Sequence, residues 1–154
     1  MIKNILFIIL IALLPGCFSK KENKLVVVNV LEKELYDDCH IKGSINIPFE
    51  DLEKEIKRLN KKDTIVLYCS DYQCTASKYG VDLLKSVGFE DVYAYEAGMA
   101  EWYQQGLPVN GACQKSYLHS KNIKLEDAEN AGEIISTGDL KEKIKQKLAV
   151  NITS

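Results

Sequence analysis

The sequence predicts an α/β fold in which helices cover both faces of a parallel β-sheet. Two continuous apolar runs, residues 25–30 and 64–69, are typical of strands that are buried on both faces. Strand-like segments also alternate with segments whose apolar residues have helical spacing. The chain has 154 residues, 20 basic and 22 acidic, which suits one domain with a buried core. This charge balance gives no indication of a nucleic-acid partner.

Eight elements are predicted in the first two thirds of the chain. In order they are strand 25–30, helical turn 32–36, strand 44–47, helix 50–59, strand 64–69, helix 75–89, strand 91–95 and helix 99–106. The second strand has Ile45 and Ile47 at alternate positions before Pro48. The helix after it is predicted from the spacing of Leu52 and Leu59, with a charged face opposite.

The helix that follows the third strand has the clearest amphipathic pattern. Ala76, Val81, Leu84 and Val87 are predicted to face inward, and Gly88 is predicted to end the helix. Because this helix follows a buried strand, the loop between them lies at the carboxyl end of the sheet. Open α/β sheets bind their ligands at that edge.

The composition changes after residue 109, where polar residues predominate. A last amphipathic helix is predicted near the C-terminus, because Leu140, Ile144 and Leu148 are spaced four residues apart and Thr137 or Asp139 can cap its start. We therefore divide the chain into a main domain over residues 25–111 and a C-terminal extension over residues 112–154.

The N-terminus has the pattern of an export signal. Lys3 precedes an apolar run over residues 5–14, which is too short to span a bilayer. The run ends in Leu-Pro-Gly-Cys, which resembles a bacterial lipobox and implies a signal peptide over residues 1–16 and lipidation of Cys17. Residues 17–24 would then be a lipidated tether. The alternative is a plain secretory signal followed by an incidental cysteine.

Lipidation would place the protein in the bacterial cell envelope, anchored to a membrane. Phe18 follows Cys17, so the aspartate that retains lipoproteins in the inner membrane of Gram-negative bacteria is absent. In such a cell the protein would be on the outer membrane facing the periplasm. Disulfides persist in exported proteins.

The stretch Tyr-Cys-Ser-Asp-Tyr-Gln-Cys-Thr-Ala-Ser, residues 68–77, contains two cysteines, Cys69 and Cys74, between a predicted strand and a predicted helix. Cys69 lies where a buried strand ends and a loop leads into a helix. Backbone N–H groups and the positive end of a helix stabilise thiolate over thiol in such a place. This arrangement predicts nucleophilic sulfur chemistry at Cys69.

Several segments together resemble the rhodanese-like domain family over residues 25–111. They read VVVNV, HIKGSINIP, IVLYCSDYQCTAS, LLKSVGFEDVYAYEAG, a tryptophan at 102 and GLPV. The resemblance implies transfer of sulfane sulfur through a cysteine persulfide, with no cofactor. The residue that matches the family's active-site cysteine is Cys69. The loop residues that follow it are Ser70, Asp71, Tyr72, Gln73, Cys74 and Thr75.

The sequence departs from the family at positions that matter for substrate choice. Asn29 stands where the family often has aspartate after the first strand, and Ser70 and Asp71 stand where basic residues are common. The sixth loop position is Cys74, where the family often has arginine, serine or threonine. An acidic loop without arginine is a poor site for the thiosulfate dianion.

Three classes of function follow from these features. The first is an envelope sulfurtransferase that uses a Cys69 persulfide, and the second is a thiol–disulfide redox protein that uses Cys69 and Cys74. The third is a non-catalytic rhodanese-like binding module. The sequence leaves the sulfur donor and the acceptor thiol open, and we expect a monomer.

Two other chemistries are disfavoured. A zinc site would have to draw on Cys39, His40, Cys69, Cys74, Cys113 and His119. Only one close cysteine pair exists among them, so no metal is expected. Phosphatase chemistry on a related loop requires an arginine where this chain has Thr75.

The cysteines also suggest two disulfides. A loop that curls around an anion brings Cys74 back toward Cys69, so we expect a reversible bond between them that switches the loop or provides its redox chemistry. Cys39 and Cys113 are the remaining cysteines of an exported chain, and we hypothesise that they pair and tie the extension to the domain.

Overall fold

The computed structural model describes residues 23–124 and 133–153. The predicted signal peptide, Cys17 and most of the tether lie outside these residues. The elements are β1 (Leu25–Asn29), α1 (Lys33–Asp38), β2 (His40–Ile41), β3 (Ile45–Asn46), η1 (Phe49–Asp51), α2 (Leu52–Glu55), η2 (Ile56–Arg58), β4 (Thr64–Tyr68), α3 (Ala76–Ser86), β5 (Val92–Tyr95), α4 (Gly98–Gln104), β6 (Val109–Asn110), η3 (Ser116–His119) and α5 (Thr137–Thr153). No helix among the described residues is long and apolar enough to cross a membrane.

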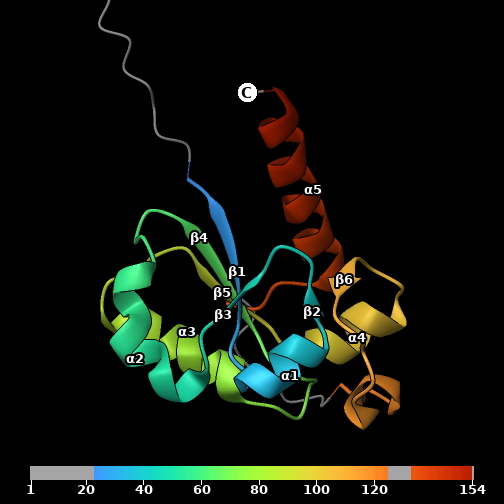
Figure 1. Cartoon of the computed structure of the whole chain (residues 1–154). Helices are drawn as coiled ribbons and strands as arrows, with labels where there is room; N and C mark the ends of the chain where they lie inside the picture. The colour runs from blue at the N-terminus through green and yellow to red at the C-terminus, as the bar shows by residue number, and fades with distance from the viewer. Residues whose placement is uncertain (1–22, 125–132, 154) are drawn as a thin grey trace, which may run out of the picture.

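The main sheet has four parallel strands in the order β3-β1-β4-β5, which confirms the predicted fold class (Figure 1). Strand β4 lies inside the sheet, where Val66 pairs with Val27 of β1 and Leu67 pairs with Ala94 of β5. Its middle residues are fully buried, as a strand with apolar side chains on both faces requires.

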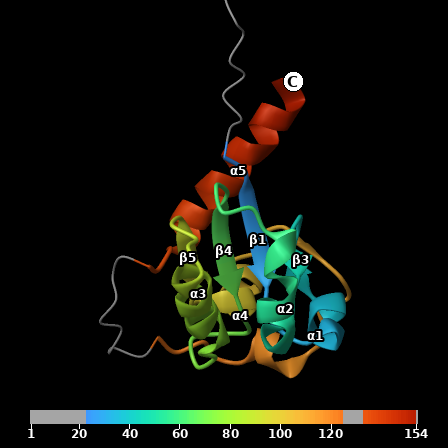
Figure 2. The same ribbon diagram turned by 90° about the vertical axis from the view of Figure 1, so that its left-hand side faces the viewer.

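Helices cover the two faces of this sheet. Figure 2 shows α2 and α3 in front of the strands and α4 behind them. One core combines Leu67 of β4 with Leu52 of α2 and Leu84 of α3. The other combines Val66 with Trp102 of α4 and Leu140 of α5. The sheet is therefore buried on both sides, which places functional residues at its ends.

The predicted helix over residues 50–59 is divided into three short pieces. Helix α2 has a single α-helical turn, and the 3₁₀ turns η1 and η2 flank it. Turns of this kind are common at helix ends. Leu52 and Leu59 are still buried, as predicted.

Helix α3 is shorter than predicted, and the prediction that Val87 faces inward is wrong. Val87 is 38% exposed, whereas Phe89 is buried. Gly88 has a φ of +89° and turns the chain after α3, so the Phe89 N–H donates to the Leu84 carbonyl. This turn brings Phe89 into the core in place of Val87.

The C-terminal extension adds a bridge to the sheet before it forms its helix. The Ala94 N–H donates to the Glu133 carbonyl at 2.7 Å, and the Ile135 N–H donates to the Ala94 carbonyl at 3.0 Å. Helix α5 then packs only its start on the domain. Leu140 is buried, Ile144 is half-buried and Leu148 is 56% exposed, so the predicted apolar face packs on the domain only at its start. Figure 1 shows the rest of α5 rising beyond the sheet.

Candidate active-site loop

The loop that contains Cys69 and Cys74 begins where β4 ends and leads into α3. It therefore lies at the carboxyl end of an interior strand, where open α/β sheets bind ligands. The first residues of α4 hold it from the other side. The Met99 N–H donates to the Cys69 carbonyl at 2.9 Å, and the Ala100 N–H donates to the Ser70 carbonyl at 2.8 Å.

Gly98 allows α4 to approach the loop this closely. Its φ is +63°, and a Cβ atom there would lie 2.6 Å from the Asp71 nitrogen. Both the backbone conformation and the space therefore require glycine. Gly98 belongs to a segment that resembles the family, but its place in the sequence does not show that it contacts the loop.

The Cys69 thiol is fully buried and has carbonyl groups around it. Its Sγ donates to the Cys74 carbonyl oxygen at 3.0 Å and lies 3.6 Å from Ser77 Oγ. The neighbouring Cys74 side chain, together with burial, raises the pKa of the Cys69 thiol. This differs from the expectation that Cys69 would be the more acidic cysteine.

Cys74 is half-buried and is the more acidic thiol of the pair. The neighbouring Cys69 side chain is the main cause, and the Ala76 and Ser70 N–H groups add to it. Together they lower the pKa of Cys74 from 9.0 to about 6. The start of α3 stabilises both thiolates, Cys74 through the Ala76 N–H and Cys69 through Ser77, but burial and the Cys74 side chain outweigh this effect at Cys69.

Other backbone N–H groups of the loop are already paired. The Gln73 N–H donates to Asp71 Oδ1 at 2.9 Å, and the Cys74 N–H donates to the Asp71 carbonyl at 3.2 Å. The Tyr72 N–H donates to Asn122 Oδ1 at 3.2 Å. Asp71 therefore shapes the loop in addition to making it acidic. Thr75 is exposed at the end of the loop.

The Tyr72 side chain joins the loop to the C-terminal extension. Its hydroxyl donates to Glu101 Oε2 at 3.0 Å, and the other Glu101 oxygen accepts from Thr137 at the start of α5. Burial and the neighbouring Glu101 raise the pKa of Tyr72 to about 12. The Tyr72 hydroxyl therefore stays protonated and can donate its hydrogen bond to Glu101. The extension thus reaches the loop through Glu101, whose position in the sequence gives no sign of this contact.

Cys39 and Cys113 form a disulfide with an S–S distance of 2.09 Å, as hypothesised. This bond removes two of the six candidate zinc ligands. His40 stacks on Tyr36 with ring centroids 3.9 Å apart, and His40 Nδ1 lies 2.8 Å from the Tyr36 carbonyl oxygen. His40 is therefore part of the packing around the disulfide. Cys69 and Cys74 are not bonded to each other in this structure.

Comparison with known proteins gives consistent matches over the main domain. The chain is 33% identical over 91 residues to the HTH-type transcriptional regulator Rv0324 of Mycobacterium tuberculosis, a match that covers 59% of this chain and 40% of that protein. It is 31% identical over 81 residues to the putative sulfur carrier protein YrkF of Bacillus subtilis, covering 53% and 43%. The chain thus spans less than half the length of these two relatives.

Solved structures with a similar sequence and fold match a similar share of the chain. The BH2092 protein from Bacillus halodurans has a TM-score of 0.54 at 30% identity, and the match covers 58% of this chain and 65% of that one. The Rhodanese_3 like domain of the Alr3790 protein from Anabaena sp. has a TM-score of 0.51 at 32% identity, covering 56% and 98%. The family model for the rhodanese-like domain matches residues 19–105, which is more than half of the chain. This chain is therefore a member of the rhodanese-like domain family.

Proposed function

We propose that this protein handles sulfane sulfur through a persulfide on Cys69. The observation that carries the proposal is the position of Cys69. It opens the loop between β4 and α3, and its thiol donates to the backbone carbonyl of a second cysteine, Cys74. Relatives named as a putative sulfur carrier and as thiosulfate sulfurtransferases, the latter 23% identical over 82 residues in Coxiella burnetii, support this class of chemistry.

The contact between the two thiols suggests how a buried Cys69 becomes a nucleophile. The Cys69 sulfur attacks the terminal sulfur of a sulfane donor, forms a new S–S bond and breaks the donor's own S–S bond, so the remainder of the donor leaves as an anion. The Cys69 thiol turns from the Cys74 carbonyl toward the Cys74 sulfur, and its proton passes to the Cys74 thiolate. The negative charge of Asp71 next to this pair disfavours a dianionic donor.

A direct test is to load the full-length chain with a persulfide donor and map the modified cysteine by mass spectrometry. We expect one added sulfur on Cys69 in the native chain and none in Cys69→Ser. Cys74→Ser should still carry the sulfur on Cys69 but load more slowly at neutral pH, because the proton acceptor is missing. Undiminished sulfur loading and transfer in Cys69→Ser would contradict the proposal.

The same contact favours a second candidate function, a thiol–disulfide redox reaction. The Cys74 thiolate can attack the inner sulfur of a Cys69 persulfide, which forms a Cys69–Cys74 disulfide and releases hydrosulfide. An external dithiol would then reduce the disulfide and become oxidised itself. In the loading experiment this reaction yields hydrosulfide and an intraloop disulfide instead of a stable persulfide.

We further propose that the chain is anchored in the cell envelope through a lipid on Cys17. The lipobox-like sequence supports the proposal, as does the Cys39–Cys113 disulfide, because such bonds persist in exported proteins. We expect Cys17→Ser to leave an unprocessed or soluble chain, whereas Cys74→Ser should fractionate with membranes as the native chain does. A Cys17→Ser chain that is still acylated, processed and membrane-bound would overturn the assignment.

A further inference from the structure

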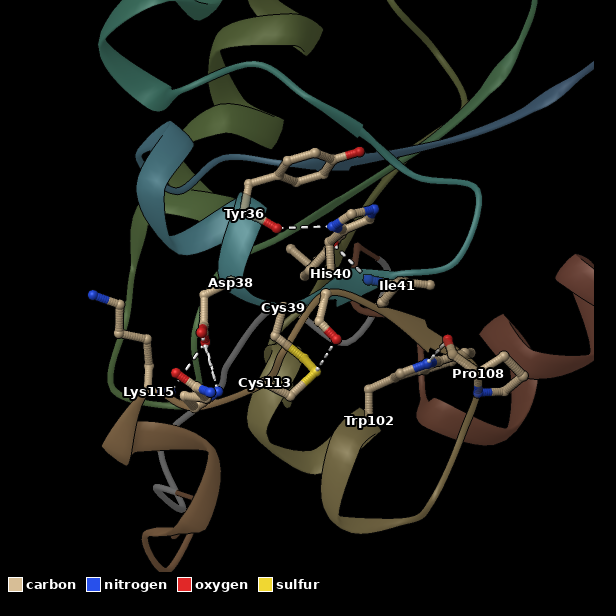
Figure 3. The surroundings of a disulfide bond; sticks show 12 residues. Tyr36, Asp38, Cys39, His40, Ile41, Trp102, Pro108, Cys113 and Lys115 are labelled. Carbon is tan, nitrogen blue, oxygen red and sulfur yellow. Dashed lines mark hydrogen bonds between the residues drawn. A yellow bond between two sulfur atoms is a disulfide. The ribbon is translucent and has the colours of Figure 1, made fainter.

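Residues 113–122, which we call the strap, follow the segment that matches the family. The strap is fixed firmly at its start. The Cys39–Cys113 disulfide ties it to the end of α1, and the Asp38 carboxylate accepts hydrogen bonds from the Gln114 and Lys115 N–H groups, each at 3.0 Å (Figure 3). Covalent and charge-assisted contacts therefore set where the strap begins.

The middle of the strap is held against α4. Leu118 is fully buried in the core that also contains Trp102. The Gln104 side chain donates from Nε2 to the carbonyls of Leu118 at 3.0 Å and Ser120 at 2.8 Å. The course of the strap over the domain is thus fixed by packing and by backbone hydrogen bonds.

The strap ends at Asn122, whose side-chain amide contacts the active-site loop on one side and the start of α4 on the other. Asn122 Oδ1 accepts from the Tyr72 N–H at 3.2 Å, and Asn122 Nδ2 donates to the Ala97 carbonyl at 2.8 Å. An amide placed the other way round would satisfy neither group. One side chain therefore joins the middle of the loop to the residue before Gly98.

We propose that Asn122 is a positioning residue of the active-site loop and that the Cys39–Cys113 disulfide holds the strap that delivers it. Tyr72 lies between Cys69 and Cys74, so its backbone position helps to set the contact between the two thiols. If the hydrogen bond between Asn122 and Tyr72 is lost, the loop can move and the contact between the two thiols can change. The proposal rests on the loop's role in sulfur chemistry, but its test measures loop structure and does not require turnover.

The test compares hydrogen exchange of the Tyr72 amide, by NMR of the full-length chain, in native protein and in Asn122→Ala. A hydrogen bond of ordinary strength predicts exchange about tenfold faster in Asn122→Ala. Ile123→Ala is the matched control, since Ile123 is the neighbouring residue and is 48% exposed, and it should leave the exchange unchanged. Asn122→Asp keeps an acceptor oxygen and should keep the Tyr72 amide protected.

A second measurement tests the anchor in a chain with native Asn122. Selective reduction of Cys39–Cys113 leaves Cys69 and Cys74 as they are, because both are already thiols. Tyr72 exchange should then rise, and the pH at which Cys74 becomes half alkylated should shift. Equal Tyr72 exchange in native protein and Asn122→Ala would overturn the positioning role. Equal exchange before and after reduction would overturn the role of the disulfide.

Discussion

Removal of the Cys39–Cys113 disulfide is expected to lower the free energy of unfolding by about 4 kcal/mol in the loop-entropy model. The bond joins residues that are 74 positions apart, so its loss frees a long segment of the unfolded chain. Domains of this size are typically stable by about 5–15 kcal/mol, so this one bond supplies a large share of the total. The reduced chain should therefore unfold at a clearly lower urea concentration than the oxidised chain.

Urea unfolding of the oxidised and reduced full-length chains measures this difference. The double variant Cys39→Ala/Cys113→Ala should resemble the reduced chain. Cys74→Ala is the control, because it removes a half-buried thiol but leaves the disulfide in place. Oxidised and reduced chains that unfold at the same urea concentration would show that the bond contributes nothing to stability.

The main sheet could be predicted from sequence because its interior strands have unusually clear patterns. Residues 25–30 and 64–69 are apolar with almost no interruption and rich in β-branched residues, which is typical of strands buried on both faces. The pair β2 and β6 was missed because each strand has only two residues, too few to show a period. Its existence depends on contacts between segments about seventy residues apart.

The position of the candidate active-site loop was also predictable, but the orientation of its side chains was not. Spacing places Cys69 at a strand end and Cys74 five residues later. The spacing of the residues does not show whether the backbone N–H groups of the loop point at the Cys69 sulfur or at the Cys74 sulfur. That depends on how Gly98 lets α4 press against the loop and on how Asp71 turns it.

Asn122 was missed for a related reason. It is 50 residues from Tyr72 in a polar stretch with no apolar period, and one asparagine there looks like any other surface residue. The extension finds its place through the disulfide, the buried Leu118 and the bridge to Ala94. Such contacts are set by the folded domain rather than by local propensity.

The second large effect concerns which cysteine reacts first. With a pKa of about 6, Cys74 is about half thiolate at pH 6, whereas roughly one in a thousand thiols with a pKa of 9.0 is ionised there. A small neutral alkylating reagent at pH 6–7 should therefore modify Cys74 and leave the buried Cys69 almost untouched. Peptide mapping across a pH series gives the apparent pKa of each thiol.

Substitution of Cys69 separates the causes of this acidity. The Cys69 side chain is the main reason that the Cys74 pKa is low, so Cys69→Ala should raise the pKa of Cys74 toward its ordinary value. Cys69→Ser keeps a donor at the same position and should raise it less. Since the thiolate fraction at a fixed pH falls as the pKa rises, alkylation of Cys74 near pH 6 should fall steeply in Cys69→Ala and partly in Cys69→Ser. Labelling that falls on Cys69 first, or an unchanged Cys74 profile in Cys69→Ala, would show that the pair does not share its proton in this way.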